Sequence, residues 1–334
     1  MILKSRTFSL ALLLAIAVMA PGVLKAQDAQ PMSETTLGTA GAGSKTGGGT
    51  VNGIAAGDLT GVPATGTAGP ESATFDGTYI WVATQFNDSV TRIRVSDGAI
   101  AGTFAVGKRP VALLYAAGAV WVANLLSDNV TKLNPATGAL IATYAAGDGP
   151  GGLAFDGTNL WIANREGNSV TKMSVTGANL GTFAVGNRPM GLAVVGGAVF
   201  VANNFSNSVT KLSLAGAVLG KYAVGRGPFG VAGQGENVWI TNYFDKTVTK
   251  LRAADGLDLG TFKVGDGASG VVFDGTFVWV VSNGDNNVMK LAPSTGSIVS
   301  TYATGKGPFA VVYDGAKIWV PNFASNSISS TAAN

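Results

Sequence analysis

The chain has 334 residues, enough for one large domain or two of ordinary size. Glycine contributes 48 residues, about twice its usual share, whereas charged residues make up 12%, about half of theirs. Hydrophobic residues make up 46% of the chain, which supplies a core and excludes general disorder. There is no cysteine and no histidine. Disulfides, Cys/His zinc sites and Ser-His-Asp triads are therefore excluded.

The N-terminus has the pattern of an export signal. Lys4 and Arg6 precede an apolar run over 8–20, and Ala26 stands before a polar stretch. The run is shorter than the roughly 20 residues that a membrane span needs. We therefore expect a signal peptide over 1–26, a secreted or periplasmic product, and no transmembrane segment.

Charge excludes one class of partner. Residues 1–26 hold three of the 22 basic residues and no acid, so 19 basic residues face the 19 acidic ones in the remainder. A nucleic-acid-binding protein keeps a basic surplus. The sequence predicts no nucleic-acid partner.

The segment 27–58 is rich in small residues and has no period, as in the run 38–50. Such a composition predicts a flexible leader. The remainder, 59–334, is expected to form one repeat domain.

An aromatic residue inside an apolar run marks seven units of the repeat. The anchors are Trp81, Trp121, Trp161, Phe200, Trp239, Trp279 and Trp319, spaced by 40, 40, 39, 39, 40 and 40 residues. This period fits either helical repeats or propeller blades. One unit contains the four runs 111–115, 119–123, 129–133 and 140–144, each β-branched or aromatic and bounded by turn residues. The pattern predicts an all-β, seven-bladed β-propeller with four antiparallel strands per blade.

Repeated polar residues are interpreted structurally. Asp-Gly pairs such as Asp156-Gly157 predict tight turns between first and second strands. Asn residues that end second strands, such as Asn124, are expected to bond the next loop's backbone. The basic residue of each third strand, such as Lys211, is interpreted as a solubilising flank. The last unit lacks a fourth strand, and the register predicts that 59–65 fills this place.

The unit Trp121-Val-Ala-Asn124, continued by Thr137-Gly138 and Gly149-Pro150, resembles the YVTN-family β-propeller repeat over about 70–330. It is also similar to streptogramin (virginiamycin B) lyase-like propellers and, more loosely, to NHL propellers. The resemblance implies an exported propeller. The lyase family's catalytic histidine has no counterpart here, because the chain has no histidine.

A ligand is expected at the face built by the last-to-first and second-to-third strand loops. The candidate binding residues are aromatics and arginines of these loops: Arg188, Phe205, Arg226, Phe229, Tyr243, Phe244, Phe309 and Phe323. Exposed aromatics with arginine are typical of binding surfaces. The two acids of the last-to-first strand loops, Asp148 and Asp266, are the candidates for a metal.

Three functions stay open. The first is a non-catalytic propeller that binds an extracellular or periplasmic protein, a glycan or a small molecule. The second is a metal-assisted enzyme of lyase or lactonase type. The third is a structural protein of the cell envelope. Enzyme status is therefore open, with binding favoured, no cofactor expected, and a monomer as the expected state.

Overall fold

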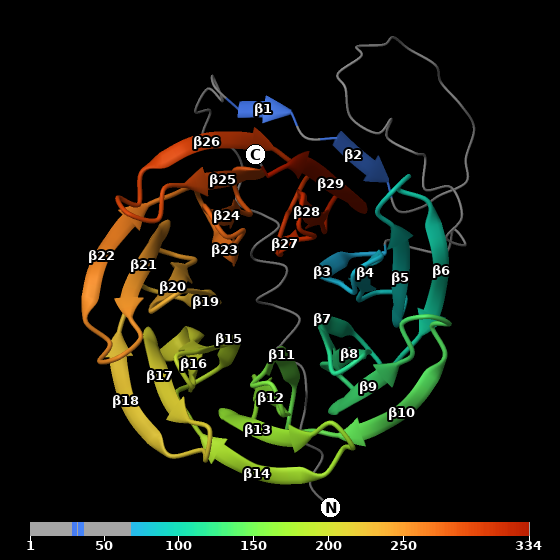
Figure 1. Ribbon diagram of the computed structural model, residues 1–334, viewed down its shortest axis with the longest axis horizontal. Coiled ribbons are helices and arrows are strands. Elements are labelled where there is room, and N and C mark those ends of the chain that lie inside the picture. Colours follow the sequence, from blue (N-terminus) through green and yellow to red (C-terminus); the bar gives the residue numbers. More distant parts are fainter. Residues whose placement is uncertain (1–28, 32, 37–67, 334) are drawn as a thin grey trace, which may run out of the picture.

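Seven sheets stand around a central channel in the computed structural model, which describes residues 29–31, 33–36 and 68–333 (Figure 1). Six of the sheets have four strands and one has five. In each blade the first strand lies nearest the channel and the fourth lies on the rim. The sheets are antiparallel within the repeat units. The predicted seven-bladed β-propeller is confirmed.

The strands follow the predicted 40-residue period. Blades one to three are β3 (Pro70–Phe75), β4 (Tyr79–Thr84), β5 (Ser89–Arg94), β6 (Ile100–Ala105); β7 (Pro110–Ala116), β8 (Ala119–Asn124), β9 (Asn129–Leu133), β10 (Leu140–Ala145); and β11 (Pro150–Phe155), β12 (Asn159–Asn164), β13 (Ser169–Ser174), β14 (Asn179–Ala184). Blades four and five are β15 (Pro189–Val195), β16 (Ala198–Asn203), β17 (Ser208–Ser213), β18 (Val218–Ala223); and β19 (Pro228–Gln234), β20 (Asn237–Asn242), β21 (Thr247–Arg252), β22 (Asp258–Lys263). Blade six is β23 (Ala268–Phe273), β24 (Val278–Ser282), β25 (Asn287–Leu291) and β26 (Ile298–Ala303), and blade seven contains β27 (Val312–Tyr313), β28 (Lys317–Asn322) and β29 (Ser327–Ala332). One 3-10 turn, η1 (Asn204–Ser206), follows β16.

The hydrophobic core lies between the blades. Each cluster joins side chains of two neighbouring sheets, as where Phe200 of blade four packs with Ile240 of blade five. Second strands such as β8 are buried along their whole length, because a neighbouring sheet covers each of their faces. The anchor aromatics are buried, with Trp161 and Phe200 fully so.

The basic residues of the third strands connect the blades, and their interpretation as solubilising flanks is wrong. Lys211 is 9% exposed, and its Nζ donates to the carbonyl oxygens of Ala253 (2.7 Å) and Ala254 (2.8 Å) in the next blade. Five further residues reach carbonyls of the following blade in the same way: Arg92, Lys132, Lys172, Lys250 and Lys290. Each cation also lies over the anchor ring of its own blade. We call these six side chains the inter-blade clasps.

Asp-Gly turns and strand-ending asparagines have the predicted kind of role, with one difference. Asp156 Oδ1 accepts from the backbone of Thr158 and Asn159, and its Oδ2 accepts from the indole of Trp161 at 2.8 Å. The turn therefore also fixes the anchor. Asn124 Nδ2 donates to Thr131 Oγ1 on the third strand, whereas Asn203 Oδ1 does accept from loop backbone, the N–H of Gly186.

The predicted closing strand is corrected. The fourth strand of blade seven is β2 (Ser33–Thr36), which pairs antiparallel with β29, and β1 (Ala29–Pro31) pairs parallel with β26 of blade six. The segment 59–65, which the register favoured, lies outside the described residues. Both short strands fall within the predicted leader, 27–58, so that part of it is ordered on the rim. The limits of the signal, the leader and the domain stay predictions.

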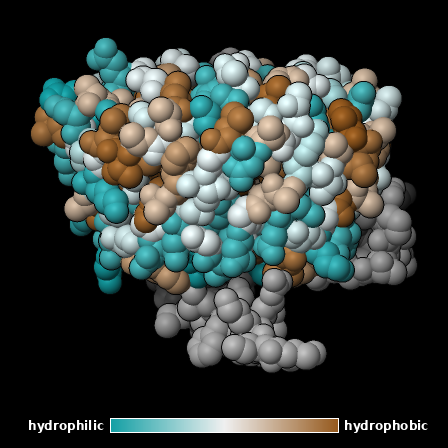
Figure 2. Space-filling model, turned by 90° about the horizontal axis from the view of Figure 1, so that it is seen from below, coloured by the Kyte–Doolittle hydropathy of each residue, from teal (hydrophilic) through white to brown (hydrophobic). Residues whose placement is uncertain are grey.

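The rim is partly apolar. In the side view of Figure 2, hydrophobic side chains lie among hydrophilic ones on the outer surface. Leu140, Ile141, Leu219 and Val299 of the outer strands are about half exposed or more. Among the described residues, no helix is long and apolar enough to cross a membrane.

Candidate functional site

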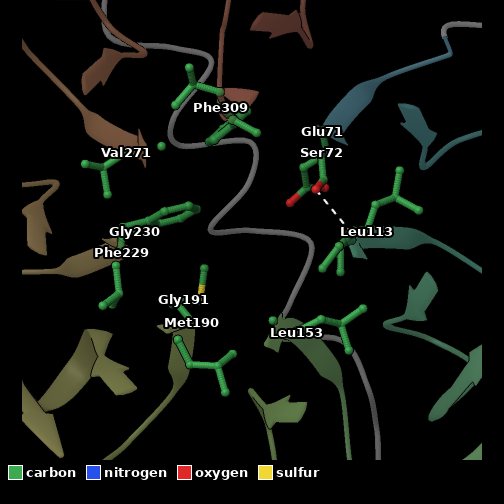
Figure 3. A pocket seen from close by; sticks show the side chains of 18 of the residues that line it. Glu71, Ser72, Leu113, Leu153, Met190, Gly191, Phe229, Gly230, Val271 and Phe309 are labelled. Atoms are coloured by element: carbon green, nitrogen blue, oxygen red, sulfur yellow. Dashed lines mark hydrogen bonds between the residues drawn. The ribbon is translucent and has the colours of Figure 1, made fainter. Parts of the chain in front are cut away.

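The mouth of the channel is formed where the inner strands begin. A cavity of about 200 Å³ lies there, and five residues that directly follow the turns into the inner strands line it: Glu71, Val111, Met190, Phe229 and Phe309. Figure 3 shows Glu71 and Phe229 projecting into the channel from facing sides. The mouth therefore has two chemically different walls.

Glycines one position further along allow the inner strands of neighbouring blades to approach each other closely. A Cβ on Gly152, Gly191, Gly230 or Gly270 would lie closer than 3.0 Å to a carbonyl oxygen of the next inner strand. Only glycine permits this approach of two backbones. The inner strands therefore touch, and the side chains available to a ligand are those at the preceding position.

One wall is a continuous chain of aromatic rings, which we call the aromatic arc. Its members, in spatial order, are Phe86, Phe323, Phe309, Phe229, Tyr243 and Phe244, with successive ring centroids 5.4, 5.7, 6.3, 6.2 and 5.3 Å apart. The outer members Phe86 and Phe244 are 56% and 52% exposed, and the others are partly buried. Partly exposed aromatic surface at a concave mouth is typical of ligand sites.

Tyr243 places a polar group within the arc. Its hydroxyl donates to Asn283 Oδ1 at 3.3 Å. Burial, with a smaller contribution from the charge of Asp266, raises the pKa of Tyr243 to about 12. The hydroxyl is therefore neutral near pH 7, and its single proton is already donated to Asn283.

The facing wall is charged. Arg165, directly after β12, lines the cavity, and its Nη2 lies 3.9 Å from Glu71 Oε1 and 3.0 Å from the carbonyl oxygen of Gly151, to which it donates. Gly151 makes room for it, because a Cβ at that position would overlap the Arg165 side chain. Arg109 and Arg188 lie close enough for their charges to act on Arg165. We call Arg109, Arg165 and Arg188 the arginine cluster.

Burial shifts the ionisation of this wall. Burial raises the pKa of Glu71 above its usual range, and the charges of Arg165 and Arg109 offset the rise only in part. Burial also lowers the pKa of Arg165, a guanidinium that nevertheless stays protonated in proteins. The wall therefore carries a positive excess.

Two members of the cluster have unusual backbones. Arg109 and Arg188 occupy the position before the proline with φ of +55° and +52°. The other five blades have glycine there: Gly69, Gly149, Gly227, Gly267 and Gly307, all with positive φ. A non-glycine residue in this region costs about 1 kcal/mol or more. Strain of this kind occurs at functional positions, and in this structure it also occurs in repeated turns, as at Asp128 and Lys246.

The structure brings together some of the candidate residues and separates others. Phe229, Tyr243, Phe244, Phe309 and Phe323 all belong to the aromatic arc. Phe205 lies outside it, under the guanidinium of Arg188 at 4.7 Å. Arg226 is exposed and does not line the cavity, and its Nε donates to Asp245 Oδ1 at 2.6 Å.

The two candidate metal ligands lie in different settings. Asp148 is exposed, and its backbone carbonyl accepts from Glu166 and Gly167. Asp266 Oδ2 pairs with Lys246 Nζ at 2.9 Å. Among the described residues, no three acidic side chains gather in a group that could hold a metal ion.

Sequence reasoning missed Glu71, Arg109 and Arg165 as site residues. Glu71 stands in the same register as Phe229 and Phe309, directly after Pro70, and this register was the available signal. The pairing of Glu71 with Arg165 could not be inferred, because the two residues belong to blades one and three.

Comparison with known proteins supports the fold. No protein-family model matches the sequence, and no curated protein matches it. A structure of hydrazine synthase from Kuenenia stuttgartiensis aligns with a TM-score of 0.74 and 18% identity over 80% of this chain and 97% of that one. A streptogramin B lyase aligns at 0.70 and 16% identity over 80% and 94%. An inactive virginiamycin B lyase variant from Staphylococcus aureus, solved with quinupristin, aligns at 0.71 and 17% over 80% and 95%. At these identities the likeness shows the propeller fold alone and says nothing about activity.

Proposed function

We propose that this chain is an exported, non-catalytic propeller that binds a small, partly apolar molecule at the mouth of its channel. The observation that carries the proposal is the aromatic arc, whose central rings Phe229 and Phe309 line the cavity. Concave sites with apolar walls and a few convergent polar groups are the usual form of a small-molecule site.

The size of the cavity favours a small molecule over a glycan chain or a folded partner. Its volume is about 200 Å³, and a cavity of about 150 Å³ accommodates one benzene ring. A protein or glycan partner would have to be engaged through the exposed ends of the arc, Phe86 and Phe244. We therefore favour the small molecule among the three ligand classes.

Catalysis is the less supported alternative. Two of the similar structures are lyases by title, but their activity belongs to those proteins and the likeness to this chain extends to the fold. Export rests on the pattern over 1–26, which lies outside the described residues.

The test replaces two rings of the arc. The double substitution Phe229→Ala and Tyr243→Ala should remove binding, because anchor aromatics at the centre of a site commonly contribute about 2 kcal/mol each. Thermal-shift measurements with a panel of small aromatic compounds would report binding, since a ligand of the native state raises the melting temperature. Tyr115→Ala is the matched control, because Tyr115 is an exposed ring near the end of β7, away from the mouth, and does not line the cavity. A shift that persists in the double variant would contradict the proposal.

A further inference from the structure

We propose that the occupant of the cavity is a small aromatic carboxylic acid, whose carboxylate binds the arginine cluster while its ring packs on the aromatic arc. This inference rests on the proposed function and names the chemical class of its ligand. An apolar ligand would account for the aromatic wall of the mouth but not for the charged wall that faces it. A ligand with both a ring and a carboxylate accounts for both walls.

The cluster carries more positive charge than its surroundings neutralise. Arg165 meets Glu71 only at 3.9 Å, a distance at which no hydrogen bond forms. Arg109 Nε donates to the uncharged Gln85 at 2.8 Å, and the guanidinium of Arg188 lies on the Phe205 ring. Three guanidinium groups thus lie within electrostatic reach of one another. Arg165 lines the cavity beside the carboxylate of Glu71, and the exposed Glu166 lies next to it in the chain.

Unused donors point to an oxyanion. The Nε atoms of Arg165 and Arg188 are buried and have no hydrogen-bond partner among the described residues. Arg165 as a whole is 9% exposed and lines the cavity. A buried donor without a partner is costly, and the guanidinium fork matches the geometry of a carboxylate.

Backbone strain supports a binding role over a structural one. Glycine serves the same position in five blades, so the fold does not require arginine there. Arg109 and Arg188 nevertheless hold positive φ at this position, on the two blades that flank Arg165. Retaining arginine against this cost is expected if its side chain binds a ligand.

The carboxylate of Glu71 sets a dependence on pH. Its charged neighbours are Arg165 from blade three and Arg109 from blade two, and Arg165 in turn faces Arg188 and Glu166. Ionised Glu71 repels an anion, whereas protonated Glu71 donates a hydrogen bond to it. Because burial raises the pKa of Glu71, affinity for an anion should increase as the pH falls toward that value.

The experiment compares an acid with its isosteric amide. Isothermal titration of the purified protein with phenylacetate and with phenylacetamide should show the acid binding about tenfold more tightly or better, as a charge-assisted pair does. Glu71→Gln should bind phenylacetate more tightly and lose the dependence on pH. This gain of affinity cannot arise from misfolding.

Arg188→Gly separates binding from stability. It installs the residue that five other blades have, so the melting temperature should stay unchanged or rise, while the affinity for phenylacetate should fall about tenfold. Arg226→Gln is the matched control, because Arg226 pairs with Asp245 and does not line the cavity, and it should leave the affinity unchanged.

The outcomes distinguish this inference from the proposed function. Equal affinity for acid and amide, or unchanged binding by Arg188→Gly, would overturn the carboxylate site. The proposed function would survive that result if both probes bind and Phe229→Ala with Tyr243→Ala abolishes their binding. Absence of binding by either probe and by the neutral aromatic panel would overturn both.

Discussion

The inter-blade clasps show how one residue type connects two sheets. The amine of Lys211 is buried between its own anchor ring and carbonyl oxygens of the following blade. A buried ammonium is stable only when its protons find acceptors, and two carbonyls and a ring face supply them. Burial lowers the pKa of the equivalent Lys250, as expected for an amine that has lost water. The clasp therefore holds the following blade through directed hydrogen bonds and also packs against the anchor ring of its own blade.

Replacing Lys211 with Met should destabilise the propeller. Methionine keeps the length of the side chain but leaves the carbonyls of Ala253 and Ala254 without their donor. We expect a loss of about 1–3 kcal/mol in the free energy of unfolding, measured in urea. Lys221→Met, at an exposed position on β18 of the same blade, should change it by less than about 0.5 kcal/mol. Equal effects at the two positions would contradict the clasp.

At the scale of strands and turns, the sequence predicts most of the fold. The 40-residue period and the apolar runs correctly place four strands in each of the first six units and three in the seventh. Second strands buried on both faces read as short continuous apolar segments. The clasps were not predictable in this way. Their acceptors lie about 43 residues away and become neighbours only when the blades stand side by side.

The candidate site was also predictable from the sequence only in part. The arc was predictable from loop aromatics, because loops of successive blades converge on one face. The pairing of Glu71 with Arg165 was not predictable, since it depends on how far the two side chains reach across the mouth. The closing strand was assigned to 59–65 for its proximity to Pro70, whereas Ser33–Thr36 has no alternating apolar pattern to mark it.

The turn of blade three that contains Asp156 predicts how the stability of the protein changes in acid. Burial by itself raises the pKa of Asp156, but hydrogen bonds from Asn159, Trp161 and Thr158, with the charge of Lys172, bring it below its usual value. The unfolded chain therefore takes up the proton first as the pH falls. The stability that this carboxylate contributes is present above about pH 4 and is lost below it.

Comparison with Asp156→Asn measures that contribution. The difference in free energy of unfolding between the two proteins should shrink from about pH 6 to about pH 3, by less than about 1 kcal/mol because solvent screens the partly exposed carboxylate. Urea titrations at several pH values would follow it. A difference that is constant across this range would show that the charge of Asp156 does not support the turn.

For the whole molecule, closure of the ring joins segments far apart in the chain. Blade one packs on blade seven through a shared cluster that contains Ile80 and Trp319, and the backbone N–H of Gly69 donates to Asn326 Oδ1 at 2.9 Å. The strand β2 completes blade seven, so that β29 is no longer an edge. An uncovered strand at this place would expose a row of unpaired backbone groups.

Deleting residues 29–36 should therefore weaken the closed ring. The loss of the β2–β29 pairing and of β1 beside β26 removes several backbone hydrogen bonds, each contributing about 1 kcal/mol, so a decrease of about 2 kcal/mol or more is expected. Replacement of 59–65 by a Gly/Ser sequence of equal length is the matched control and should change the melting temperature much less. Thermal and urea unfolding of the two variants decides between the alternatives. If the replacement lowers stability and the deletion does not, the closing strand lies in 59–65 after all, and the pairing of β2 contributes nothing to the ring.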